Sequence, residues 1–224
     1  MRRLAPVAFL AVAAIGLASL VAVAAFRTSS LAFTLGVVPK APVAKVVPRH
    51  VACQRWVTTE ADFAAVRLSV GAFRRGRLAV ILSPAEGGAP ISSGGIAVAR
   101  GRSDRVVKLD REVPKERRVT LCVRNEADGV LALYGGSAEA RAGTALYLDN
   151  RNKRSDLTLV FLRRPPRSTL SQVPEILARA SLFRPRWVGA WTFYLVLLLV
   201  GVGVPGLIFG ALWNARDAAE TLNR

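Results

Sequence analysis

The chain has 224 residues, and its 32 Lys and Arg against 15 Asp and Glu give a formal net charge of +17. Removing an uncharged apolar segment at each end leaves about 160 residues, which suits one domain with its own core and not two. The chain has a single histidine and no P-loop or GxSxG motif. We therefore expect no catalytic residue, no cofactor and no bound metal.

The first apolar segment is residues 4–26, an uncharged run of 23 residues that follows Arg2 and Arg3. Its length is sufficient for a transmembrane helix. The small residues at 22–24 also fit the cleavage site of a signal peptide, although a signal peptide usually has a shorter apolar region. We favour a retained helix behind a short cytoplasmic N-terminus, residues 1–3.

Residues 27–52 are rich in Val and Ala and are interrupted by Pro39, Pro42 and Pro48. Prolines at this spacing prevent a helix and favour extended or polyproline-like chain. We therefore predict a tether between the first apolar segment and the folded domain. The only histidine, His50, lies in this tether, and one imidazole without a second half-site does not make a metal site.

Residues 53–164 have an apolar period of two. Short runs rich in Val and Leu are separated by Gly, Pro, Asn and Asp clusters at intervals of roughly 10–15 residues. This pattern predicts an all-β domain, an antiparallel β-sandwich of the jelly-roll or immunoglobulin-like type. The predicted strands centre on residues 66–70, 78–82, 105–110, 119–123, 130–134, 145–148 and 157–162.

The two cysteines, Cys53 and Cys122, lie far apart in the chain and make no CxxC motif. In an extracytoplasmic domain the simplest interpretation is one disulfide. The chain-entropy model assigns roughly 4 kcal/mol of stabilisation to a loop of this length. Two buried free thiols are the alternative, and we favour the disulfide.

Most of the positive charge lies between the apolar segments, where residues 27–186 hold 28 Lys and Arg against 13 Asp and Glu. Beside a membrane, such a surface suits anionic lipid head groups or acidic envelope polymers better than nucleic acid. The alternative explanation of the positive charge is a need for solubility together with the codon bias of a GC-rich genome. Arg74, Arg75 and Arg77 lie in a predicted turn and are the best candidates for bidentate contacts to an anionic glycan.

Residues 165–186 form a predicted basic linker and a short helix. Val173, Ile176, Leu177 and Ala180 follow helical spacing. The spacing indicates an amphipathic helix, either along the membrane interface or packed on the domain.

Residues 187–213 contain no charged residue. At about 1.5 Å of rise per residue, they exceed the roughly 30 Å hydrocarbon core of a bilayer, so we predict a second transmembrane helix. A short cytoplasmic tail, residues 214–224, follows. The rings near the two ends are typical of a membrane-interface belt and belong to Trp187, Trp191, Tyr194 and Trp213.

Small residues in both apolar segments predict helix packing. Ala14 and Ala18 are four residues apart on one helical face, and Gly206 and Gly210 make a GxxxG motif. A kink is also expected where Gly201, Gly203 and Pro205 precede that motif.

The charges beside the two apolar segments disagree about orientation. Arg2 and Arg3 favour a cytoplasmic N-terminus, whereas Arg179, Arg184 and Arg186 precede the second segment and favour the opposite. Because the first helix usually dominates and long domains translocate regardless of charge, we expect both termini in the cytoplasm. The main domain would then be extracytoplasmic, at the plasma membrane.

Two stretches carry a family resemblance. Residues 180–207, ASLFRPRWVGAWTFYLVLLLVGVGVPGL, resemble a segment of two-span membrane proteins of GC-rich bacteria, and residues 145–163, ALYLDNRNKRSDLTLVFLR, resemble the closing strands of their extracytoplasmic β-sandwich. Such proteins accompany glycosyltransferases and other cell-surface polysaccharide genes. The resemblance implies an accessory protein that assists polysaccharide or glycoconjugate assembly or export.

The sequence thus favours a membrane-anchored binding protein without catalytic activity. Its expected partners are membrane lipids, a membrane protein such as a glycosyltransferase or transporter, and an anionic glycan, with no nucleic acid. One alternative is a structural assembly subunit with no ligand of its own. Another is an envelope carbohydrate-active enzyme that uses paired carboxylates from among Glu60, Asp62, Asp110 and Glu112.

Overall fold

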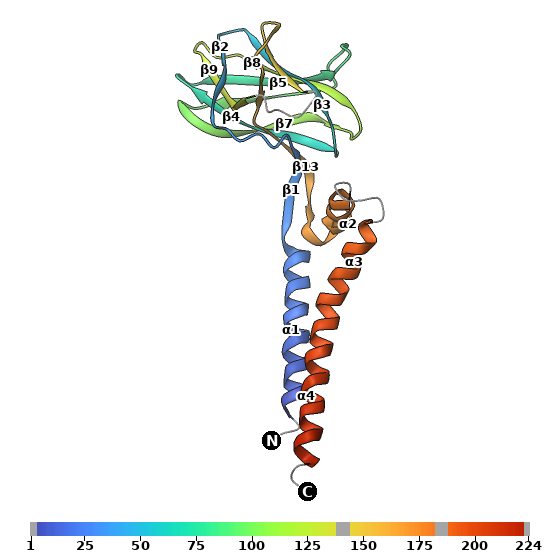
Figure 1. Ribbon diagram of the computed structural model, residues 1–224. Coiled ribbons are helices and arrows are strands. Elements are labelled where there is room, and N and C mark those ends of the chain that lie inside the picture. The colour runs from blue at the N-terminus through green and yellow to red at the C-terminus, as the bar shows by residue number, and fades with distance from the viewer. Residues whose placement is uncertain (1–3, 138–143, 182–187, 222–224) are drawn as a thin grey trace. The chain divides into compact units, whose positions relative to one another are not determined.

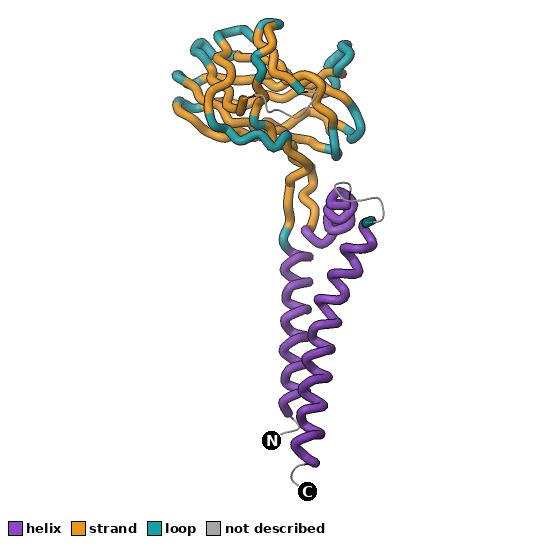
Figure 2. Tube along the Cα trace, in the orientation of Figure 1, coloured by secondary structure: helices purple, strands orange, loops and turns teal. Residues whose placement is uncertain are grey.

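The computed structural model describes residues 4–137, 144–181 and 188–221 (Figure 1). The chain forms two compact units. The sheet unit is Ser30–Pro166, and the helical unit combines Met1–Ser29 with Arg167–Arg224. Figure 2 distinguishes them by secondary structure, with strands in orange and helices in purple.

The sheet unit contains two sheets, and every strand pair of described register is antiparallel. The larger sheet has the order β1-β13-β4-β9-β12, with β7 also paired to β4 and β2 to β9. Its strands are β1 (Thr28–Thr34), β2 (Ala41–Val46), β4 (Phe63–Ala72), β7 (Gly101–Val113), β9 (Leu131–Ser137), β12 (Ser155–Leu157) and β13 (Leu159–Ser168).

The smaller sheet has the order β11-β10-β3-β8-β5-β6. Its strands are β3 (Val51–Thr58), β5 (Gly76–Pro84), β6 (Ser92–Val98), β8 (Arg118–Asn125), β10 (Ala145–Leu148) and β11 (Arg151–Asn152). Each strand run predicted from the period of two coincides with one of the observed strands or, at 157–162, with β12 and β13. The predicted antiparallel β architecture is confirmed.

The core follows from the alternation of apolar and polar residues. On β8, Val119, Leu121 and Val123 are fully buried, whereas the residues between them are partly or fully exposed. Leu82 and Val80 of β5 are the register partners of Leu121 and Val123 and are also fully buried. Side chains from both sheets join one hydrophobic cluster. Burying each Val or Leu side chain stabilises the fold by about 1.5–3 kcal/mol.

A polar link inside the core joins the two sheets. The Gln54 Nε2 on β3 donates a hydrogen bond to the Asp156 Oδ1 on β12 at 2.5 Å, and the Leu157 N–H donates to the Gln54 Oε1 at 3.0 Å. Gln54 and Asp156 are both buried. The other carboxylate oxygen of Asp156 accepts a bond from Thr144. The buried side chains of Gln54 and Asp156 are thus paired, as stability requires.

The segment predicted to be a tether is largely sheet. Strands β1 and β2 lie in it, and Phe33, Leu35 and Val46 are buried in the core. Pro42 is tolerated because, among the described strands, β2 pairs only with β9, so one side of it needs no ladder hydrogen bond. The folded unit therefore begins well before the expected boundary at Cys53.

The helical unit contains α1 (Leu4–Phe26), α2 (Thr169–Ser181), α3 (Ala190–Leu198), the π-helical turn η1 (Leu199–Gly203) and α4 (Val204–Thr221). The helix α1 contacts α2 and α4 (Figure 1). Val7–Phe26 and Ala190–Ala215 are long and apolar enough to cross a membrane. The short helix expected after the last strand is present as α2.

The residues where a kink was expected in the second apolar segment contain the π turn. Pro205 has no backbone N–H, so the Gly201 carbonyl four residues earlier lacks its usual helical donor. The Val204 N–H instead donates to the Leu199 carbonyl, five residues back. One extra residue is thereby accommodated between α3 and α4.

Candidate ligand-binding surface

The predicted disulfide is present. Cys53 on β3 and Cys122 on β8 are bonded, and they are direct register partners on neighbouring strands of the smaller sheet. Both residues are partly exposed on the sheet's outer face. The bond thus closes a long chain loop at the centre of this sheet.

The predicted arginine turn is a crossing between the two sheets. Strand β4 belongs to the larger sheet and β5 to the smaller, so residues 73–75 carry the chain from one to the other. Arg74 and Arg75 lie in this connection and are exposed, whereas Arg77 lies on β5. The three arginines therefore have different surroundings.

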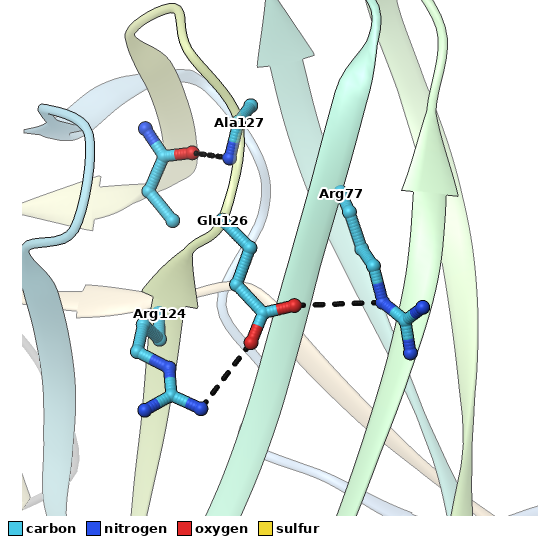
Figure 3. A network of polar contacts seen from close by, with 5 residues as sticks. Arg77, Arg124, Glu126 and Ala127 are labelled. Carbon is cyan, nitrogen blue, oxygen red and sulfur yellow. Dashed lines mark hydrogen bonds and ion pairs between the residues drawn. The ribbon is translucent and has the colours of Figure 1, made fainter.

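Arg77 takes part in an ion-pair network with Glu126 and Arg124 (Figure 3). The Arg77 Nε lies 3.4 Å from one carboxylate oxygen of Glu126, and the Arg124 Nη2 lies 3.2 Å from the other. The carboxylate of Glu126 therefore offsets the charge of two guanidinium groups. Arg77 is already partnered and is a weaker candidate for an external anion than Arg74.

Arg74 belongs to a surface with a different composition. Phe73, which is 68% exposed, lines two neighbouring hollows of about 250 and 510 Å³. Arg100 and Arg102 line the first hollow, and Lys45 and Arg74 line the second. We call Phe73, Lys45, Arg74, Arg100, Arg102 and Tyr134 the Phe73 surface.

The Phe73 surface is cationic and partly preorganised. The guanidinium carbon of Arg102 lies 4.2 Å from the centre of the Tyr134 ring, and its Nη2 donates to the Pro39 carbonyl at 2.7 Å. Stacking on the ring holds the guanidinium plane and leaves its other N–H donors available. The described residues that line one or the other hollow include four cationic side chains and one carboxylate, that of Asp128. The arrangement suits an anionic ligand.

Two of the four carboxylates considered for catalysis, Asp62 and Asp110, accept hydrogen bonds that join strands or loops. The Asp110 carboxylate on β7 accepts hydrogen bonds from the Ser92 Oγ at 2.6 Å and the Ser93 N–H at 2.8 Å. The bond from Ser92, followed by that from the Ser93 backbone, lowers the Asp110 pKa to about 2. Asp62 accepts a bond from the Lys115 N–H. In the part of the chain that the structure describes, no cluster of His, Cys, Asp or Glu is suited to a metal.

The residues predicted at the membrane lie in the helical unit. Trp191 and Tyr194 on α3 and Trp213 on α4 are exposed, and Trp187 lies outside the described residues. Ala14 and Ala18 are on α1, and Gly206 and Gly210 are on α4. A Cβ at either glycine would have no described neighbour within 4 Å. These glycines therefore do not mediate the contact between α1 and α4.

Sequence reasoning missed most of the Phe73 surface. Phe73, Lys45, Arg102 and Tyr134 come from separate segments that meet only when the strands pair. The only local signal was the run of arginines beside Phe73. In comparisons with known proteins, no protein-family model and no curated protein matches the chain.

Proposed function

We propose that the chain is a membrane-anchored binding protein of the bacterial cell envelope that holds an anionic glycan at the Phe73 surface. The exposed ring of Phe73 between two cation-lined hollows carries the proposal. An aromatic face accommodates the C–H groups of a sugar ring, and Arg and Lys donate to carboxylate or phosphate oxygens. The protein acts by binding and not by catalysis.

The membrane and envelope assignments have their own support. The two apolar helical segments are long enough to place α1 and α3–α4 across the plasma membrane. The disulfide supports an extracytoplasmic sheet unit, because oxidised cysteines persist outside the cytosol. Two antiparallel sheets around one core support a β-sandwich of the jelly-roll or immunoglobulin-like type. Both termini then lie in the cytoplasm.

The cellular role we propose is to assist polysaccharide or glycoconjugate assembly or export. A glycosyltransferase or transporter in the same membrane would process the glycan that the Phe73 surface holds. Gly206 and Gly210 leave an open helix face on α4, where a transmembrane helix of that partner could approach closely.

Binding of a defined anionic polysaccharide tests the proposal. Full-length protein in detergent micelles is titrated with polygalacturonate, with neutral dextran as the comparison, and affinity is measured by calorimetry. We expect binding to polygalacturonate only. Replacing Arg74 and Arg100 together by Ala should weaken it at least tenfold, because each charged hydrogen bond contributes about 1.5–3 kcal/mol.

A matched control distinguishes a local site from general attraction to a basic protein. Arg118 is exposed on β8 and does not line the two hollows. The variant Arg118→Ala removes one positive charge and should keep nearly full affinity. Equal losses in the Arg74 and Arg118 single variants would contradict a defined anion site at the Phe73 surface.

The open glycine face favours a second candidate, a structural assembly subunit with no ligand of its own. It predicts that the protein binds no polygalacturonate and still co-purifies stoichiometrically with a membrane protein in mild detergent. Replacing Gly206 and Gly210 by Leu should then abolish co-purification, because the larger side chains prevent close helix approach.

A further inference from the structure

The smaller sheet carries a third hollow with different chemistry. It has a volume of about 460 Å³, within the range of about 300–1,000 Å³ typical of small-ligand sites. Its lining includes His50, Arg55, Tyr147, Asp149 and Asn150, with Cys53 of the disulfide among them. We call it the Tyr147 hollow.

Two preformed hydrogen bonds arrange the polar groups of the Tyr147 hollow. The His50 Nδ1 lies 2.8 Å from the Asp149 Oδ1, and the Arg55 Nη2 donates to the Asn150 Oδ1 at 2.6 Å. The His50 and Asp149 side chains remain about half exposed, at 48% and 51%. Each pair uses only part of its hydrogen-bonding capacity, so donors and acceptors remain for a ligand.

The charges of this hollow are mixed, in contrast to those of the Phe73 surface. Arg49 and Arg55 are balanced in part by Asp149, whose carboxylate would repel an anion. Asn150 and Asp149 offer acceptors, whereas Arg55 offers donors. A sugar hydroxyl both donates and accepts hydrogen bonds, so this set suits a neutral polyol better than an acid.

Tyr147 lines the hollow, and the ring of Trp56, which is not part of the lining, contacts Tyr147. The Arg55 guanidinium carbon lies 4.3 Å from the centre of the Tyr147 ring and covers one of its faces. The neighbouring Trp56 meets Tyr147 edge to face, with ring centres 5.8 Å apart. Trp56 is 41% exposed. Its indole therefore presents apolar surface to solvent beside Tyr147.

A β-bulge turns Trp56 toward solvent. The register of β3 and β8 shifts between Gln54 and Val57, and both of these residues are buried. In a regular strand, Trp56 would point inward with Gln54, because side chains alternate. The extra residue instead leaves Arg55 and Trp56 both outside the core, which is how bulges redirect side chains.

Backbone strain is concentrated around this hollow. The structure describes six non-glycine residues with positive φ; three of them line the Tyr147 hollow, and a fourth, Trp56, contacts Tyr147. These are Arg49, Trp56, Asp149 and Asn150, with φ of 67°, 57°, 49° and 67°. Asp and Asn tolerate this region, but for a bulky Trp or Arg it is unfavourable. Strained residues of this kind gather where a fold serves a ligand.

We propose that the Tyr147 hollow binds a neutral pyranose unit of a glycan. Trp56 contacts the C–H face of the sugar, while Asp149, Asn150 and Arg55 exchange hydrogen bonds with its hydroxyls. The disulfide supports the site, because Cys53 is the register partner of both Tyr147 and Cys122. Pro48 lines both this hollow and one hollow at the Phe73 surface, but none of the residues proposed to contact the sugar belongs to the Phe73 surface.

Saturation-transfer difference NMR tests the proposal on the full-length protein. The probes are methyl β-D-glucopyranoside, methyl β-D-galactopyranoside and methyl α-D-mannopyranoside. The protein is held in dodecylphosphocholine, because a maltoside detergent would itself present a sugar. We expect saturation transfer to the ring C–H protons of at least one glycoside. Transfer to none of the three would overturn the proposal.

Two variants locate the binding without disturbing the backbone. Asn150→Gly removes the amide and suits positive φ, and Trp56→Asn removes the indole and keeps a residue that tolerates the left-handed region. Each should weaken glycoside binding about tenfold, because ring contacts and hydrogen bonds are lost. Unchanged binding in both variants would also overturn the proposal.

The variant Phe73→Ala is the matched control, because it removes an exposed ring from the other surface. It should leave glycoside binding intact while it weakens polygalacturonate binding. Glycoside binding reports on the Tyr147 hollow and polygalacturonate binding reports on the Phe73 surface. Either proposal can therefore be contradicted while the other stands.

Discussion

At the scale of single residues, buried polar side chains hold the loops that present the candidate sites. Asn125 is fully buried at the end of β8. Its Nδ2 donates to the carbonyls of Val46 and Gly129 at 2.8 and 2.7 Å, and its Oδ1 accepts the Ala127 N–H at 2.8 Å. One side chain thus shapes the β8–β9 turn, joins it to β2, and precedes Glu126 of the ion-pair network.

We predict that Asn125→Ala destabilises the sheet unit by about 2–3 kcal/mol, because it leaves buried backbone groups without partners. Urea unfolding followed by far-UV circular dichroism measures the change. Arg118→Ala, an exposed substitution on the same strand, serves as the control and should lie within about 0.5 kcal/mol of the parent. A similar small effect for Asn125→Ala would contradict the bonding described here.

Asp110 makes stability depend on pH. Its hydrogen bonds from Ser92 and Ser93 lower its pKa in the folded protein from 3.8 to about 2. Because the folded pKa lies below the unfolded one, protonation favours unfolding. The contribution of Asp110 is therefore complete above about pH 4 and is lost as the pH falls toward 2.

The expected result is a melting temperature that falls between pH 4 and pH 2, with a shallower fall in Asp110→Asn. Arg118→Ala is the control, since it changes an exposed side chain without removing a carboxylate, and it should keep the parental slope. Identical slopes in the parent and Asp110→Asn would show that Asp110 is not the responsible group.

At the scale of elements, close strand contacts decide where glycine is required. Strand β6 of the smaller sheet runs against β7 of the larger, and the Ser92–Asp110 bonds join them. A Cβ on Gly94 would overlap the Lys108 carbonyl oxygen of β7. On the neighbouring Gly95, a Cβ would meet only the end of the flexible Arg77 side chain.

We predict that Gly94→Ala destabilises the protein by about 1–3 kcal/mol, because backbone atoms must separate to admit the methyl group. Gly95→Ala should change stability by less than about 1 kcal/mol, since Arg77 can move. Urea unfolding of the pair compares them directly. A larger effect at Gly95 would mean that β6 does not approach β7 as described.

At the scale of the whole molecule, the chain enters and leaves the sheet unit within strands. The boundaries at residues 29–30 and 166–167 fall in β1 and β13, which are neighbours in the larger sheet. The first apolar helix, α1, is thus followed directly by β1, whereas α2 comes between β13 and the second apolar segment. A retained first helix would hold the sheet unit to the membrane at both of its ends.

The membrane prediction is that the protein resists alkaline carbonate extraction, because two apolar spans hold it in the bilayer. Protease added to intact spheroplasts should degrade the sheet unit and spare the C-terminal tail. An epitope tag added after Arg224 allows the tail to be detected. Protection of a cytosolic protein from the protease serves as the control that the cells are intact. Protection of the sheet unit would place it in the cytoplasm and contradict the envelope assignment.

Much of the fold was predictable because its signals are local. The alternation in Val119–Val123 specifies a strand from adjacent residues, and the lack of charge over residues 188–213 specifies an apolar helix. The disulfide was predictable because the chain has only two cysteines. The prolines at 39–48 led to the wrong prediction of a tether. Pro42 is compatible with a strand only at a sheet edge, and neighbouring residues in the sequence do not show whether a strand lies at an edge.

The sequence by itself determined the strands, the two apolar helices and the excess of positive charge, because each depends on neighbouring residues. Only the tertiary structure decided which arginines remain available to a ligand. Pairing between distant strands places Arg77 beside Glu126, gathers Arg74 and Arg102 around Phe73, and turns Trp56 outward at a bulge. These contacts join residues that are far apart in the chain, so they form only when the strands pair and the two sheets pack together.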